Sequence, residues 1–246
     1  MEAARTVWRP RTADEDLLCS CGHPELAHKD PDRVARMSAE LATGFADLRG
    51  VTKAVSIFGS ARAGSGTAEY AAARAVAEAL GRAGFAVITG GGPGVMEAAN
   101  RGACDAGALS IGLTIELPHE QGTNDYVDRP VHFSYFFARK VMFVRYAAAF
   151  VALPGGFGTL DELFEALTLI QTEKISNFPV VLVGSDYWSG LVDWLRGHLR
   201  DEGRISPTDI ELLHVTDDTD AVVDLVTRGH DAQLAALGLA EPRTWS

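Results

Sequence analysis

The chain has 246 residues, of which 47% are hydrophobic and 22% charged, and this composition excludes a mainly disordered protein. It carries 22 Lys and Arg against 33 Asp and Glu, and the net charge of −11 argues against binding to nucleic-acid backbones or anionic membranes. The longest apolar run covers only residues 147–153, which is too short to cross a bilayer.

The expected location is the cytoplasm. The first 16 residues contain charged side chains and no apolar stretch of the secretory type. The three cysteines, Cys19, Cys21 and Cys104, are too few for a disulfide scaffold, which agrees with a reducing compartment.

Short apolar runs alternate with helical segments along most of the chain. Residues 1–37 hold three prolines without a regular period and predict an irregular leader, followed by a short amphipathic helix. Strands are predicted at residues 54–58, 85–89, 109–117, 149–153 and 178–183. Helices are predicted at residues 37–48, 69–82, 95–106, 135–148, 159–174, 187–202 and 217–228. The helix over 135–148 is apolar on most sides, so we expect it to be buried or to form a subunit contact.

Continuous apolar strands that are each followed by a helix predict an α/β fold, a Rossmann-like doubly wound parallel sheet with helices on both faces. We expect an N-terminal leader and helix over residues 1–50, the Rossmann-like domain over 51–230 and a C-terminal tail over 231–246. Ligands of such sheets bind beyond the carboxyl ends of the strands. Three glycine-rich turns are expected at that edge, at residues 59–66, 90–94 and 155–158.

The segment PGGFGTLDE at residues 154–162 joins a predicted strand to a predicted helix. Its glycines let the backbone approach a ligand, and the helix start adds unpaired N–H groups and partial positive charge. These features predict a phosphate site. The alternative is a capping box made by Thr159 and Glu162, which needs no ligand but leaves the three glycines unexplained.

The other two glycine turns match no standard nucleotide motif. The turn at 90–94 has Val95 where a dinucleotide fingerprint needs glycine, and the turn at 59–65 has Ser65 where a P-loop needs lysine. Together the three turns indicate a pocket of mononucleotide size.

Two groups of polar residues leave alternatives open. Arg139 and Lys140 lie on a largely apolar helix, so they serve either a structural ion pair or a ligand phosphate, ribose hydroxyl or carboxylate. The leader holds possible zinc ligands without standard finger spacing, and loop residues without metal are the alternative. These are Cys19, Cys21, His23 and His28.

Four segments resemble the LOG ("lonely guy") family: SIFGSAR at 56–62, GGGPGVME at 90–97, FARK at 137–140 and PGGFGTLDE at 154–162. The resemblance covers residues 52–228, and the chain looks like the larger bacterial branch, which forms higher oligomers than the plant-type dimers. Family members are cytokinin riboside 5′-monophosphate phosphoribohydrolases, many of them formerly labelled lysine decarboxylases. The resemblance implies hydrolysis of the N-glycosidic bond of AMP or N6-substituted AMP to free base and ribose 5-phosphate.

The resemblance also implies site residues. Arg139 and Glu162 are the implied catalytic pair, with no metal at the active site, no cofactor, and a homo-oligomer as the expected assembly. The implied substrate contacts, with those expected from the first two turns, are Gly59, Ser60, Gly91, Gly92, Met96, Glu120, Lys140, Gly155, Gly156, Phe157, Gly158, Thr159, Leu160, Asp161 and Thr168. Asp161, Glu165 and Thr168 share one helix side at i, i+4 and i+7, so we expect Thr168 to line the same pocket.

The chemistry of glycosidic cleavage agrees with these roles. The reaction passes through an oxocarbenium-like state, which a carboxylate near C1′ stabilises while it activates water. A nucleotide- or cofactor-binding protein without turnover is the alternative, because fold and glycine turns would be the same. A pyridoxal-dependent lysine decarboxylase is disfavoured, since none of the four lysines has an evident cofactor setting.

Overall fold

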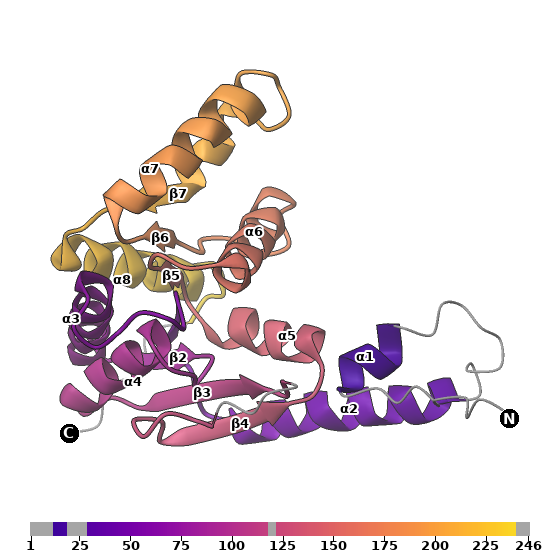
Figure 1. Ribbon diagram of the computed structural model, residues 1–246. Helices are drawn as coiled ribbons and strands as arrows, with labels where there is room; N and C mark the ends of the chain where they lie inside the picture. Colours follow the sequence, from indigo (N-terminus) through magenta and orange to yellow (C-terminus); the bar gives the residue numbers. More distant parts are fainter. Residues whose placement is uncertain (1–11, 19–28, 118–121, 240–246) are drawn as a thin grey trace, which may run out of the picture.

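A parallel sheet in the order β4-β3-β2-β1-β5-β6-β7 forms the centre of the protein (Figure 1). The computed structural model describes residues 12–18, 29–117 and 122–239. The strands are β1 (Ala54–Phe58), β2 (Ala86–Thr89), β3 (Ser110–Ile115), β4 (Arg129–Phe133), β5 (Phe150–Ala152), β6 (Val180–Leu182) and β7 (Leu213–Val215). All six strand pairs are parallel, which confirms the predicted α/β class.

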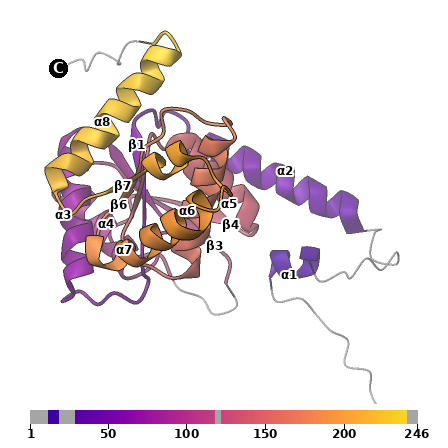
Figure 2. The ribbon, with the colours of Figure 1, turned by 90° about the horizontal axis from the view of Figure 1, so that it is seen from above.

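Helices cover both faces of the sheet (Figure 2). The α-helices of the described residues are α1 (Ala13–Leu18), α2 (Asp30–Asp47), α3 (Ala68–Arg82), α4 (Val95–Asp105), α5 (Phe136–Tyr146), α6 (Phe157–Gln171), α7 (Ser185–Trp194) and α8 (Thr219–Ala236), and α1 lies apart from the sheet. One apolar core packs α3, α4 and α8 on the sheet, and the other packs α5, α6 and α7. Central strands are therefore buried on both sides, which explains their uninterrupted apolar sequences.

The strand order fixes where a ligand can bind. From β1 the chain moves outward through β2, β3 and β4, and then returns to pair β5 with the other side of β1. The carboxyl ends of β1 and β5 thus flank a switch point, where connections leave the sheet in opposite directions and open a crevice.

The structure departs from the predicted elements at several places. Helix α2 begins at Asp30 rather than near residue 37, because Pro31 lies in its first turn, where proline is tolerated. Strands β4 and β7 were not predicted: both are sheet edges, and β4 (RPVHF) contains proline and a charge. A π-helix over Leu195–Arg200 continues α7, and α8 extends to Ala236, beyond the expected end.

Helix α5 is not the buried helix that its composition suggests. Only Ala138, Met142 and Phe143 are buried, whereas Phe136, Phe137 and Val141 are 40–42% exposed.

Within the described residues, no helix is long and apolar enough to span a membrane. The possible zinc ligands Cys19, Cys21, His23 and His28 lie outside the described residues.

Candidate active site

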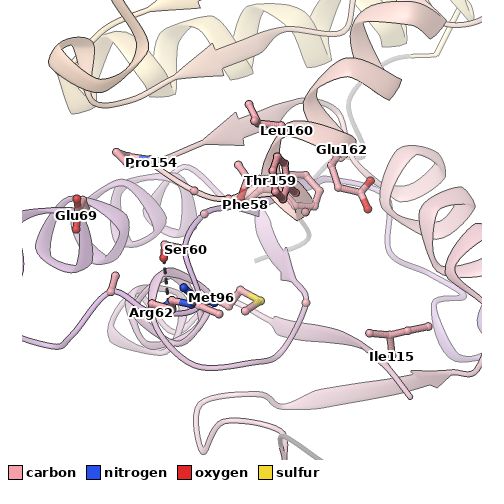
Figure 3. Close-up of a pocket in the computed structure, with 18 of the residues that line it drawn as sticks. Phe58, Ser60, Arg62, Glu69, Met96, Ile115, Pro154, Thr159, Leu160 and Glu162 are labelled. Carbon is pink, nitrogen blue, oxygen red and sulfur yellow. Dashed lines mark hydrogen bonds between the residues drawn. The ribbon is translucent and has the colours of Figure 1, made fainter. Parts of the chain in front are cut away.

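A cavity of about 1000 Å³ opens at the switch point (Figure 3). Its walls come from the turns after β1, β2 and β5 and from the starts of α5 and α6. In Figure 3, Glu162 and Thr159 lie across the cavity from Ser60, Arg62 and Met96. The volume is sufficient for a nucleotide.

The turn after β5 presents backbone donors to this cavity. Helix α6 starts at Phe157, and its N-cap, Gly156, has no side chain to cap it. The Gly156 carbonyl accepts hydrogen bonds from the N–H groups of Thr159 (3.0 Å) and Leu160 (3.1 Å). No acceptor within the described residues contacts the N–H groups of Phe157 and Gly158, both of which line the cavity. The helix start therefore has free donors for an anion.

The capping-box alternative is wrong for this helix. Thr159 lies inside the first turn rather than at the N-cap position, and no side chain caps the helix. The Oε2 atom of Glu162 has no hydrogen-bond partner among the described residues. Glu162 is thus not held by the backbone at Thr159 and has a free oxygen for chemistry.

Packing fixes the shape of the turn. A Cβ atom at Gly155 would collide with the Thr159 side chain, so only glycine fits here without a shift. The Tyr187 hydroxyl on α7 donates a 2.6 Å hydrogen bond to the Gly155 carbonyl. The Ser60 N–H donates to the Pro154 carbonyl at 2.9 Å, which ties the first glycine turn to the third.

Glu162 and Arg139 supply the charged groups of the cavity. Glu162 is 3% exposed, and burial raises its pKa to about 7 although Lys140 and Arg139 act in the opposite direction. Burial also lowers the pKa of Arg139, with Glu162 and Asp161 opposing the shift. The guanidinium lies 4.8 Å from the ring centre of Phe136, and its buried Nε has no partner in the described part of the chain. The site therefore holds a desolvated carboxyl and a guanidinium with one buried N–H group that no described residue accepts.

Lys140 does not line the cavity that Arg139 lines. Its Nζ forms ion pairs with Asp161 (2.9 Å) and Glu165 (2.7 Å), and together with Thr168 these residues line a second depression. Asp161, Glu165 and Thr168 do share one helix side, but it is not the side of Glu162. The structural ion pair is thus the observed arrangement for Lys140, and Thr168 does not line the cavity itself.

The remaining predicted contacts fall into three groups. Gly59, Ser60, Met96, Gly155, Gly156, Phe157, Gly158, Thr159 and Leu160 line the cavity. Gly91 and Gly92 are not among the residues that line the cavity, and their carbonyls accept hydrogen bonds from the Asn124 side chain at 3.1 and 3.0 Å. Glu120 lies outside the described residues.

Several cavity residues were missed from the sequence. Arg62 lies within the first glycine turn, shortly after the end of β1, so its place at a strand end was a usable signal. Tyr187 is 32 residues from the carbonyl that it contacts, and no local pattern indicates such a pairing. An apolar wall was also missed, formed by Ile115, Leu117, Phe136 and Phe143.

Comparisons with known proteins show the family of the chain. A family model described as "Possible lysine decarboxylase" matches residues 96–226. The cytokinin riboside 5′-monophosphate phosphoribohydrolase of Rhodococcoides fascians is 31% identical over 66% of this chain and 83% of its own length. The enzyme of that name from Mycobacterium tuberculosis is 34% identical over 58% of this chain and 76% of its own. Among solved structures, a molybdenum cofactor binding protein from Rippkaea orientalis has a TM-score of 0.54 at 22% identity, covering 72% and 96% of the two chains, which supports the fold alone.

Proposed function

The chain belongs to the LOG family of phosphoribohydrolases, and we propose that it hydrolyses the N-glycosidic bond of AMP or an N6-substituted AMP. The products are the free base and ribose 5-phosphate. One observation carries this proposal: the buried carboxyl of Glu162 shares a cavity with the free N–H groups at the start of α6. A phosphate bound at those donors would bring the ribose of the same nucleotide toward the carboxyl group.

The proposed mechanism assigns one task to each part of the cavity. The N–H groups of Phe157 and Gly158 bind the 5′-phosphate and hold C1′ in place. The Glu162 carboxylate stabilises the positive charge that develops on the ribose and activates the attacking water. Arg139 binds the sugar hydroxyls or orients that carboxylate. The apolar wall of Ile115, Leu117, Phe136 and Phe143, together with Met96, accommodates the base and any substituent on N6.

A turnover assay tests the proposal. Wild-type protein incubated with AMP and with N6-isopentenyl-AMP should release free base and ribose 5-phosphate in equal amounts. Glu162→Gln should lose this activity, whereas Glu211→Gln, which changes an exposed carboxylate outside the cavity, should retain it. Tight nucleotide binding without product would instead favour a binding protein without turnover.

The proposed reaction uses no cofactor, and the site does not fit the pyridoxal chemistry that the family description suggests. Among the described residues no lysine lines the cavity. The nearest sequence candidate, Lys140, forms ion pairs with two carboxylates in the separate depression. Addition of pyridoxal phosphate should therefore give no aldimine absorbance band.

We also propose a cytoplasmic homo-oligomer. Large apolar side chains are exposed together on α5 and α6, and Phe157 reaches 90% exposure. They are Phe136, Phe137, Val141, Phe157 and Phe164. Such a surface is typical of a subunit interface. Light scattering should give a mass at least twice the 26.3 kDa of one chain, and Val141→Asp should lower it; a monomeric wild type would contradict this.

A further inference from the structure

The helix that carries Arg139 is capped by residues far away in the sequence. Its own N-cap residue, Tyr135, makes no side-chain capping bond. Instead, the Glu40 carboxylate on α2 accepts hydrogen bonds from the N–H groups of Ser134 (2.6 Å) and Tyr135 (3.1 Å). Asp14 on α1 accepts another from the Phe136 N–H at 3.1 Å. Two carboxylates thus occupy the N-terminal end of α5, where negative charge is favourable.

Helix α1 is fixed in place by a buried arginine. The Arg33 side chain on α2 is 4% exposed and pairs with Asp16 on α1 at 3.1 Å. It also donates to the Asp16 backbone carbonyl at 2.7 Å and pairs with Asp30 at 2.9 Å. Because Arg33 is desolvated and multiply bonded, it holds Asp14 close to α5.

Helix α2 packs closely along α5. Gly44 is buried, and a Cβ atom there would lie 2.9 Å from the Met142 side chain on α5. The Tyr146 hydroxyl at the end of α5 donates to the Phe45 carbonyl at 3.4 Å. The two helices are therefore joined at the capped end of α5 and along its length, beside each other in Figure 1.

Arg139 lies one turn from the capped amides. Its N–H donates to the Tyr135 carbonyl at 3.3 Å. That carbonyl shares a peptide unit with the Phe136 N–H that Asp14 holds, and Glu40 holds the N–H of Tyr135 itself. The negative charge of Asp14 additionally opposes the lowering of the pKa of Arg139 by burial. Both carboxylates therefore act on Arg139, which lines the same cavity as Glu162.

We propose that Glu40 and Asp14 are positioning residues. By holding the N-terminal end of α5, they fix where the Arg139 side chain lies in the active site. This inference rests on the proposed phosphoribohydrolase reaction. It gives a role to α1 and α2, which precede the segment 96–226 that the family model matches. A displacement of a catalytic group by about 1 Å can cost 10²-fold in rate, so loss of these caps should affect turnover.

The test compares Glu40→Ala, Glu40→Gln, Asp14→Asn and the control Asp32→Asn. Asp32 is exposed on α2 and makes no hydrogen bond or ion pair with the described residues. Glu40→Ala should lower kcat about tenfold or more with KM for AMP within about twofold, because the phosphate-binding turn is untouched. Glu40→Gln keeps one acceptor oxygen and should recover part of kcat. Asp14→Asn should cost less than Glu40→Ala, and Asp32→Asn should match the wild type.

Hydrogen exchange provides a readout that is independent of turnover. Amides 134–139 should exchange faster in Glu40→Ala and Asp14→Asn than in the wild type or Asp32→Asn. The inference is overturned if kcat and these exchange rates stay within twofold of wild type, or if the loss in Glu40→Ala follows only the folded fraction. A wild type that releases no base refutes the proposed function instead, and the exchange rates then still decide whether the two carboxylates hold α5.

Discussion

Replacement of Glu162 by glutamine should make the protein more stable while it removes activity. The carboxyl is 3% exposed, and burial raises its pKa from 4.5 to about 7. In the unfolded chain the group ionises above pH 4.5, whereas in the folded protein it stays neutral until about pH 7. A rise in pH therefore favours the unfolded state through this range, and the cost reaches a plateau above pH 7.

The size of the effect follows from the two pKa values. The difference between the pKa of Glu162 in the unfolded chain and in the folded protein corresponds to a free energy of about 3 kcal/mol, at roughly 1.36 kcal/mol per pH unit. Glutamine cannot ionise, so Glu162→Gln should exceed the wild type in unfolding free energy by about 1 kcal/mol at pH 5 and by about 3 kcal/mol at pH 8. Such a gain on loss of a catalytic group is a typical stability–activity trade-off.

Urea denaturation of the wild type, Glu162→Gln and the surface control Glu211→Gln between pH 5 and 8 measures this difference. The control should show no comparable pH-dependent gain. A gain for Glu162→Gln that is the same at every pH, or a loss of stability at pH 8, would refute the argument that a desolvated carboxyl faces the cavity.

Four further outcomes are expected. The value of kcat/KM should rise with pH and level off above about 7, because the carboxylate form of Glu162 is the reactive one; a profile that falls through pH 7 would make it an acid instead. Arg139→Lys should lower kcat/KM by about 10²-fold in initial-rate assays, since an ammonium lacks the planar fork, and near-normal rates would contradict its role. Gly155→Ala should abolish AMP binding in calorimetry through its collision with Thr159, whereas Gly190→Ala, which meets open space, should bind normally. Tyr187→Phe should raise KM for AMP about 2- to 10-fold through the lost hydrogen bond to Gly155, and an unchanged KM would show that this bond does not support the turn.

The buried centre of the fold could be predicted from the sequence, but its edges could not. Strand β1 is buried along its whole length, so its apolar run identified it without ambiguity. In the edge strand β4, burial alternates and a proline interrupts the pattern. The exposure of α5 could not be predicted either, because an apolar sequence does not distinguish a core contact from a surface that another subunit covers.

The site was predictable where backbone geometry determines it. The glycine turn and Glu162 lie at a strand end and a helix start, positions that the motif specifies directly. Lys140 and Asp161 were harder, since each is adjacent to a cavity residue and neighbours on a helix point about 100° apart. The caps from Asp14 and Glu40 lie about 94 to 122 residues from their partners, and no local pattern reports a contact at that separation.

A crystal structure with AMP bound tests the central claim most directly. The 5′-phosphate should accept hydrogen bonds from the backbone N–H groups of Phe157 and Gly158, with C1′ of the ribose facing the Glu162 carboxyl group. A nucleotide whose phosphate lies elsewhere, or whose ribose is turned away from Glu162, would contradict the account.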